Sequence, residues 1–320
     1  MAVTGINIEA AAAHLRAGRL VAIPTETVYG LAGNAFDPGA VAGIFEAKQR
    51  PAFDPLICHA ASMEQVAGIV ADIPEAARAL GRAVWPGPLT MILPRGPKVP
   101  DLVTSGLDTV GVRIPRHPMS LALLAQLDFP LAAPSANPFG YVSPTTAAHV
   151  DRYLGEKIAY ILDGGEAQVG IESTIVGFEA DGLVVYRMGG MSIEQLRELS
   201  GTEDIHVMAH SSSNPKAPGM LKSHYAPRIP FALGDIPAMA ARHAGKSLAI
   251  LSFEQNYPDI SAASRIVLSP AGDLGEAARR LFAALRELDD SGVELILAEE
   301  VPDTGLGRAI NDRLRRAAAR

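Results

Sequence analysis

The residues with the clearest chemical potential form a polar cluster between apolar runs near the start of the chain. The segment Pro24-Thr25-Glu26-Thr27-Val28-Tyr29-Gly30-Leu31 follows the apolar residues 20–23, and Lys48-Gln49-Arg50-Pro51 and His59 come soon after it. The apolar run is typical of a buried strand that Pro24 ends, so the threonines would emerge at the strand's carboxyl end, where α/β sheets bind ligands. The sequence therefore predicts half of an active site in this segment.

Two cations, Lys48 and Arg50, are expected at the C-terminal end of a helix. Asp37 and Pro38 supply an N-cap and a first-turn proline, and the apolar spacing that follows extends this helix to about Lys48. A lysine and an arginine held near a pocket offer a point charge and a planar fork, which suit a polyphosphate. The alternative is surface charge that only complements the helix dipole, and the sequence leaves both open.

A second polar cluster contains Ser135, Asn137 and Ser143, and it follows another short apolar run that ends at residues 131–132. Ser143 precedes Pro144 and is expected to be the N-cap of a helix over residues 145–153, a place that also favours a phosphate group. Ser135 and Asn137 fit a turn equally well, because asparagine before proline often starts one. Function and turn formation stay open for these two residues.

Three further residues lie in or beside apolar strands. Arg113 is flanked by Val112 and Ile114, Ser173 lies in the segment 171–176, and Arg187 closes the run 184–187. An arginine in such a strand needs an anion or a solvated sheet face.

His59 could be a satisfied core histidine, but Ala60 and Ala61 after it indicate that its strand ends at a pocket. Cys58, the single cysteine, is expected to be buried and not a nucleophile.

Together these blocks resemble the threonylcarbamoyl-AMP synthase family, also called the YrdC type, which makes the activated intermediate for threonylcarbamoyladenosine in tRNA. The resemblance covers nearly the whole chain, and the 217–220 and 224–227 segments are typical of the long, two-domain form. Its motifs are PTETVYGL at 24–31, KQRP at 48–51, PLICH at 55–59, WPGPLT at 85–90, VRIP at 112–115, PSAN at 134–137 and IESTIV at 171–176.

The resemblance implies an α/β fold, with a YrdC-like twisted core over residues 1–207 and a smaller Rossmann-like domain over residues 231–320. Between them, residues 208–230 are expected to form a linker that covers the active site. For L-threonine, the implied contacts are Thr27, His59, Arg113, Ala133 and Ser173. For ATP, they are Lys48, Arg50, Asp54, Ser135, Asn137, Ser143, Arg187 and Tyr225. Lys48 and Arg50 would act by positioning charge.

One of these ATP contacts departs from the family pattern, which commonly has asparagine where this chain has Asp54. A carboxylate there would repel phosphate unless Lys48, Arg50 or magnesium neutralised it. The expected substrates are ATP, L-threonine and bicarbonate, with Mg²⁺ accompanying ATP and no organic cofactor. The product would pass to a tRNA threonylcarbamoyl transferase.

Composition agrees with a cytoplasmic enzyme that has no membrane segment. The chain has 320 residues, 48% hydrophobic and 20% charged, with a formal net charge of -7. An acidic total disfavours extensive RNA wrapping, so direct tRNA binding is expected to be weak. The two alternative functions are an RNA-binding module and a carbamoyl-transfer domain like that of hydrogenase maturation factors. The acidic charge counts against the first, and the missing Cys-x-x-Cys pattern counts against the second.

Overall fold

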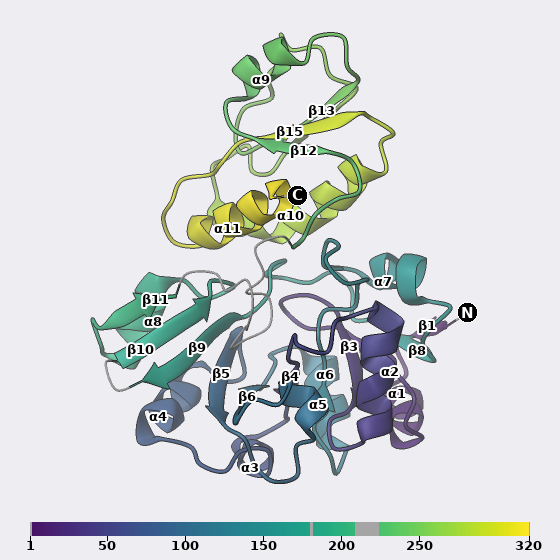
Figure 1. Ribbon diagram of the computed structural model, residues 1–320, viewed down its shortest axis with the longest axis vertical. Helices are drawn as coiled ribbons and strands as arrows, with labels where there is room; N and C mark the ends of the chain where they lie inside the picture. The colour runs from purple at the N-terminus through teal and green to yellow at the C-terminus, as the bar shows by residue number, and fades with distance from the viewer. Residues whose placement is uncertain (1, 180–181, 209–223, 320) are drawn as a thin grey trace.

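A computed structural model describes residues 2–179, 182–208 and 224–319, and this part of the chain folds around two sheets (Figure 1). The larger sheet has the strand order β1-β8-β2-β3-β7-β4-β6-β5-β9-β10-β11, and the smaller has the order β12-β15-β13-β14. The last strand of the larger sheet ends at Val207, and the smaller sheet begins at Phe231. The domain limits assigned within residues 207–231 stay a prediction, because much of that segment lies outside the described residues.

The larger sheet is mixed. Strands β4 and β6 run parallel, as do β5 and β9, whereas β6 pairs with β5 in the antiparallel direction. Its strands are β1 (Val3–Gly5), β2 (Val21–Ile23), β3 (Gly30–Asn34), β4 (Ile57–His59), β5 (Leu89–Pro94), β6 (Thr109–Arg113), β7 (Leu131–Ala132), β8 (Tyr160–Leu162), β9 (Thr174–Glu179), β10 (Gly182–Arg187) and β11 (Ile205–Val207). The polar segments predicted from the sequence follow the ends of β2, β4, β6 and β7.

Eight helices accompany this sheet within the described residues. They are α1 (Ile8–Arg16), α2 (Pro38–Lys48), α3 (Met63–Ala67), α4 (Glu75–Val84), α5 (Asp101–Thr104), α6 (Pro118–Ala125), α7 (Ala147–Leu154) and α8 (Ile193–Ser200). The prediction for α2 is confirmed. The Asp37 carboxylate accepts a 2.8 Å hydrogen bond from the Gly39 amide at its start, and the helix ends at Lys48.

The predicted helix start at Ser143 is wrong. Helix α7 begins at Ala147, and its N-cap is Thr146, whose hydroxyl accepts a 3.2 Å hydrogen bond from the His149 amide. The Ser143 hydroxyl instead donates to the Glu172 carboxylate at 2.5 Å. Glu172 is remote in sequence, so no local pattern could reveal this competing partner.

The smaller sheet is entirely parallel, as expected for a Rossmann-like unit. The predicted β/α/β arrangement is confirmed in β13, α10 and β15. The elements of this unit are β12 (Phe231–Leu233), α9 (Ile236–Arg242), β13 (Leu248–Ser252), β14 (Ser264–Val267), α10 (Leu274–Asp289), β15 (Leu295–Ala298) and α11 (Gly307–Ala318).

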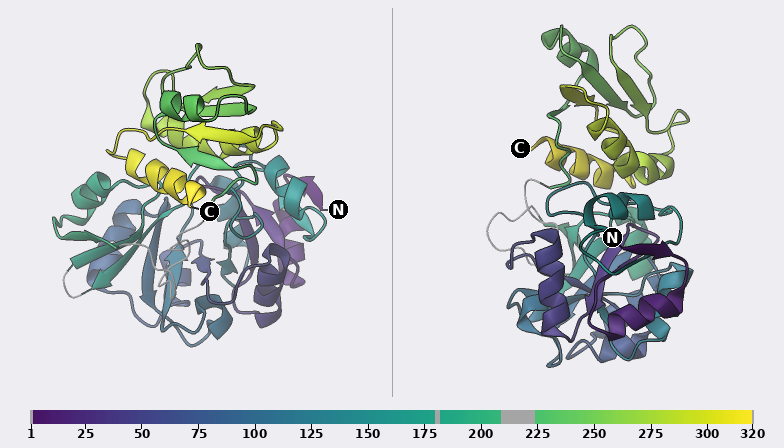
Figure 2. Two further views of the ribbon diagram at one scale, coloured as in Figure 1. Left: turned by 45° about the horizontal axis from the view of Figure 1, so that its top comes forward. Right: turned by 90° about the vertical axis from the view of Figure 1, so that its right-hand side faces the viewer.

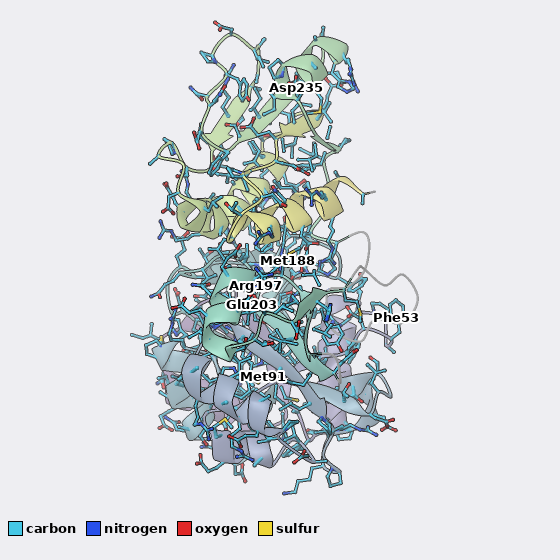
Figure 3. All side chains as sticks on the ribbon, turned by 90° about the vertical axis from the view of Figure 1, so that its left-hand side faces the viewer. Phe53, Met91, Met188, Arg197, Glu203 and Asp235 are labelled. Atoms are coloured by element: carbon cyan, nitrogen blue, oxygen red, sulfur yellow. The ribbon has the colours of Figure 1, made fainter. Side chains whose placement is uncertain are left out.

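Helices α10 and α11 lie between the smaller sheet and the larger unit (Figures 1 and 2). Apolar side chains of both units form one cluster there, in which Tyr141 and Val142 join Phe282 and Leu285. Met188 lies at the same junction, below the helices (Figure 3). In the part of the chain that the structure describes, no helix is long and apolar enough to cross a bilayer.

Candidate active site

A polar cavity lies at the strand ends of the larger sheet. It encloses about 590 Å³ of space free of protein atoms, and part of that space is open to solvent. The lining residues come from both predicted clusters and from the segment before the smaller sheet. They are Thr25, Thr27, Val28, Gly30, Arg50, Ile57, His59, Arg113, Ala133, Pro134, Ser135, Glu172, Ser173, Arg187, His224 and Tyr225.

Arg113 forms the most tightly held part of this lining. Its side chain ends β6 and is 3% exposed, so the alternative of a solvated sheet face is wrong. One guanidinium nitrogen lies 2.7 Å from the Glu26 carboxylate, and another donates to the Thr27 hydroxyl at 2.9 Å. Burial raises the pKa of Glu26, but the charge and hydrogen bonds of Arg113 outweigh it and hold that pKa below its usual value. The pair fixes a planar fork at the cavity wall, a geometry suited to a carboxylate ligand.

His59 is the last residue of β4 and lines the cavity, as its position before two alanines indicated. It is 3% exposed, and burial lowers its pKa to about 3, with the Arg113 charge acting in the same direction. The imidazole is therefore neutral at physiological pH and suits hydrogen bonding or packing rather than charge pairing. Ala133 lies nearby in the lining, where its amide donates to the Ile57 carbonyl at 3.0 Å.

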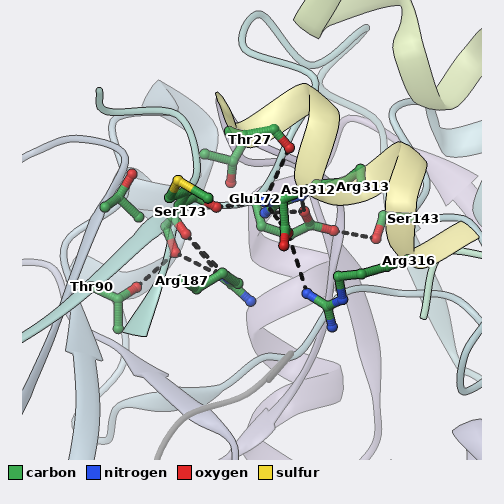
Figure 4. Close-up of polar contacts among 12 residues, drawn as sticks. Thr27, Thr90, Ser143, Glu172, Ser173, Arg187, Asp312, Arg313 and Arg316 are labelled. Carbon is green, nitrogen blue, oxygen red and sulfur yellow. Dashed lines mark hydrogen bonds and ion pairs between the residues drawn. The ribbon is translucent and has the colours of Figure 1, made fainter. Parts of the chain in front are cut away.

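Ser173 and Arg187 form a third part of the wall. The Ser173 hydroxyl contacts the Thr90 hydroxyl at 2.8 Å and accepts a 3.1 Å hydrogen bond from Arg187 (Figure 4). Arg187 also donates to the Ser173 carbonyl, so β9 and β10 are tied together at the cavity.

Arg50 and Ser135 bring the two predicted clusters together, since both line the cavity. Arg50 donates to the carbonyls of Asp54 and Pro55 and lies 2.8 Å from the Asp54 carboxylate. Asp54 is fully buried and does not line the cavity, so the geometry gives it an indirect place behind Arg50. This arrangement resolves the predicted conflict with phosphate, because Arg50 stands in front of the carboxylate.

Lys48, Asn137 and Ser143 were predicted as ATP contacts, but they do not line the cavity. The Lys48 ammonium is 2.5 Å from the carbonyls of both Ser135 and Asn137, so it anchors the loop that carries Ser135. The Asn137 amide donates to the carbonyls of Pro138 and Tyr141, as in the alternative of a turn. Ser143 binds Glu172, as described above. These three side chains shape the wall from behind.

Tyr225 of the predicted linker lines the cavity and is 1% exposed. Its ring stacks on Phe282 of α10 with centroids 5.5 Å apart, and the Arg313 guanidinium lies 5.2 Å from its centroid. The linker residues Pro218, Gly219 and Met220 lie outside the described residues.

Sequence reasoning did not assign a role to Glu172, although it lines the cavity beside Ser173. Its carboxylate lies 3.0 Å from Arg313 of α11, a side chain with no exposed surface (Figure 4). Burial raises the pKa of Glu172, but the charges of Arg313 and Arg187 and the Ser143 hydrogen bond hold it below its usual value. The position of Glu172 within the largely apolar segment 171–176 could have indicated a role at the site. Arg313 gave no such signal, because basic residues on an amphipathic helix usually face solvent.

Comparisons with known proteins agree with this arrangement across both units. The Sua5_yciO_yrdC family model, described as telomere recombination, matches residues 13–189. A second model, described as the threonylcarbamoyl-AMP synthase C-terminal domain, matches residues 191–319.

The chain is 44% identical to the threonylcarbamoyl-AMP synthase of Pyrococcus abyssi, with 98% of this chain and 94% of that protein covered. It is 41% identical to the enzyme of the same name from Bacillus subtilis, over 98% of this chain and 93% of that protein. The structure superposes on the crystal structure of P. abyssi Sua5 complexed with L-threonine with a TM-score of 0.92, at 40% identity, covering 99% of this chain and 97% of that one. The chain belongs to the threonylcarbamoyl-AMP synthase family.

Proposed function

We propose that this chain acts as an L-threonylcarbamoyladenylate synthase. It joins L-threonine, bicarbonate and ATP into threonylcarbamoyl-AMP and releases pyrophosphate and water. The observation that carries the proposal is one cavity that holds the Arg113 fork with Thr27 and His59, and also Arg50 and Arg187. These groups supply a carboxylate partner and separate cations for phosphate. The P. abyssi structure complexed with L-threonine supports an amino acid in the corresponding fold.

The chemistry needs positioned charge rather than a protein nucleophile. The threonine amine displaces water from bicarbonate, or adds to carbon dioxide and loses a proton, to form a carbamate. A carbamate oxygen then attacks the α-phosphorus of ATP while the bond from that phosphorus to the β-phosphate oxygen breaks and pyrophosphate leaves. Cations that hold both anions in place favour this attack. Arg113 would orient the threonine carboxylate, and Arg50 and Arg187 would orient ATP. Cys58 is fully buried and burial raises its pKa to about 12, which disfavours a thiolate.

Magnesium would enter with ATP rather than bind a protein cage. No group of three or more His, Cys, Asp or Glu residues among those described could hold a metal ion. Glu172 lines the cavity and Glu26 and Asp54 lie behind its lining, and each of these carboxylates is paired with an arginine. Among the described residues, the side chains around the cavity therefore do not fit a resident metal site. Transfer of the product to a tRNA threonylcarbamoyl transferase, with little direct tRNA binding, is part of the same proposal.

Pyrophosphate release tests the proposed function. We expect ATP to yield pyrophosphate only when L-threonine and bicarbonate are both present, because the carbamate is the nucleophile. Serine lacks one methyl contact, worth roughly 1–3 kcal/mol, and should be used about 10-fold less well or worse. Pyrophosphate release without any amino acid, or equal turnover with glycine, would contradict the proposal.

A further inference from the structure

Arg316 is a buried cation whose hydrogen-bonding groups are largely unused by the residues that the structure describes. The residue lies on α11 and is 2% exposed. Its Nε and Nη2 atoms have no hydrogen-bond partner in the described chain, and its Nη1 lies 3.4 Å from the Asp312 carboxylate. A buried guanidinium with free donors carries a desolvation cost that an anionic ligand would offset.

The surroundings of Arg316 connect it to the active site. With Arg187, Asp312 and Met208, it lines a small hollow, and Arg187 also lines the main cavity. The guanidinium groups of Arg187 and Arg316 turn toward each other (Figure 4). Burial lowers the pKa of Arg187, and the Arg316 charge adds to this effect while Tyr225 and Glu172 oppose it. Two cations that face each other in a buried site favour an anion between them.

The remaining neighbours of Arg316 leave room for this role. Asp312 is the carboxylate nearest to it, and that group already lies 3.1 Å from Arg313. The Tyr225 ring lies 4.9 Å from the Arg316 guanidinium carbon, so the ring orients the cation without neutralising it. The threonine carboxylate already has a matching fork in Arg113, which leaves phosphate as the anion for Arg316.

We propose that Arg316, together with Arg187, binds the β- and γ-phosphates of ATP and the pyrophosphate that they become. The second unit would thereby supply a cation to the reaction in the first. This inference rests on the proposed function in taking ATP as the substrate. Because a planar fork matches phosphate oxygens, the contact should discriminate ligands by their terminal phosphates.

Calorimetric titration of the full-length chain with ATP, AMP and inorganic pyrophosphate, in one magnesium-containing buffer, tests this contact. Arg316→Gln should weaken ATP and pyrophosphate binding by roughly 10- to 100-fold, the value of a charge-assisted hydrogen bond, and leave AMP binding unchanged. Arg315→Gln is the matched control, since Arg315 is the next residue of α11 and its side chain is 54% exposed in a surface pair with Glu300. It should leave all three affinities unchanged.

Arg316→Lys separates loss of the phosphate contact from a folding defect, because it keeps the positive charge at this position. Its ATP affinity should lie between those of wild type and Arg316→Gln. The proposal would be overturned if Arg316→Gln weakened AMP binding as much as ATP binding. It would also be overturned if the variant bound both ATP and pyrophosphate as tightly as wild type. Loss for ATP with unchanged pyrophosphate binding would overturn the role with the leaving group. A wild-type chain that binds pyrophosphate through Arg316 but makes no threonylcarbamoyl-AMP would instead contradict the proposed function.

Discussion

At the residue scale, three arginines around the site each have a buried carboxylate partner. Arg113 is paired with Glu26, Arg50 with Asp54, and Arg313 with Glu172. The first two arginines line the cavity, where such a partner fixes the orientation of the fork before a substrate arrives. The partner also makes each arginine costly to remove, because the carboxylate would remain buried without a counter-charge.

Arg113→Ala separates these two effects. We expect loss of threonine binding together with a loss of stability of about 3–5 kcal/mol, because Glu26 is left unpaired. Adding Glu26→Gln should recover much of the stability without restoring threonine affinity. Calorimetry with L-threonine and chemical unfolding measure the two quantities. Arg50→Ala is the contrasting variant and should weaken ATP rather than threonine. Normal threonine binding in the Arg113→Ala, Glu26→Gln chain would show that Arg113 is not a threonine ligand.

At the element scale, α11 fixes the junction between the two units. Arg313 binds the Glu172 carboxylate through two nitrogens and also donates to the Met188 carbonyl at 2.5 Å. From α10, Arg286 donates to the Val142 and Ser143 carbonyls. The Arg313 contact reaches the cavity wall at Glu172, and the Arg286 contacts hold the segment of Val142 and Ser143 that lies outside the lining.

The pH dependence of stability tests the Arg313 contact. The pKa of Glu172 is lowered in the folded chain, so its stabilising contribution is present above the unfolded pKa and is lost as the pH falls through the folded value. Arg313→Met should destabilise the chain by about 3–5 kcal/mol near neutral pH. The difference in free energy of unfolding between this variant and wild type, here called the stability deficit, should shrink as the pH falls from about 8 to about 5. The reason is that the unpaired Glu172 can then take up a proton. Urea unfolding across this range measures the deficit.

Glu172→Gln provides the control for that experiment. In the double variant with Arg313→Met, the pH dependence of the deficit should disappear, because no carboxylate remains. A deficit that stays constant with pH in the single variant would mean that lost packing, rather than the unpaired charge of Glu172, accounts for it.

The linker contact at Tyr225 gives another test at this scale. Tyr225→Ala removes an aromatic ring stacked on Phe282 and should weaken ATP binding and expose the labile adenylate to water. Tyr225→Phe keeps the ring and should retain most of the activity. The measurements are ATP affinity and the rate of adenylate hydrolysis. Unchanged values in Tyr225→Ala would reduce this segment to a tether.

Truncation near residue 207 is a less specific test of the linker than Tyr225→Ala. It would leave Glu172 without Arg313 and expose the apolar side chains around Tyr141 and Val142. Lower stability would then accompany any loss of the linker's cover over the cavity.

Local signals predicted the elements better than the roles of single residues. Helix α2 followed from its N-cap, first-turn proline and apolar spacing, all of which lie within the helix itself. The cavity positions of Thr27 and His59 followed from their places at strand ends, whereas for Arg113 the strand pattern left a solvated sheet face open and the family resemblance implied the ligand contact. Lys48 and Ser143 engage partners that are distant in sequence, so their spacing could not reveal whether they face a ligand or the protein. Arg313 and Arg316 were missed because only the docking of the two units buries them.

At the scale of the whole molecule, side chains of both units meet beside the proposed active site. The strand ends of the larger sheet supply most of the cavity lining, and the smaller unit places Arg313 beside Glu172 and Arg316 beside Arg187. A change in the docking of α11 would therefore alter the charge of the site without moving any residue of the larger sheet. This organisation makes the second unit part of the catalytic machinery in our account.

The most direct test of the central claim is detection of the product. The chain is incubated with ATP, L-threonine and ¹³C-labelled bicarbonate, quenched rapidly, and analysed by mass spectrometry together with the released pyrophosphate. The account predicts a threonylcarbamoyl adenylate that carries one labelled carbon and forms in step with pyrophosphate. Pyrophosphate with an unlabelled threonyl adenylate, or no adenylate at all from a folded chain that binds ATP and L-threonine, would contradict it.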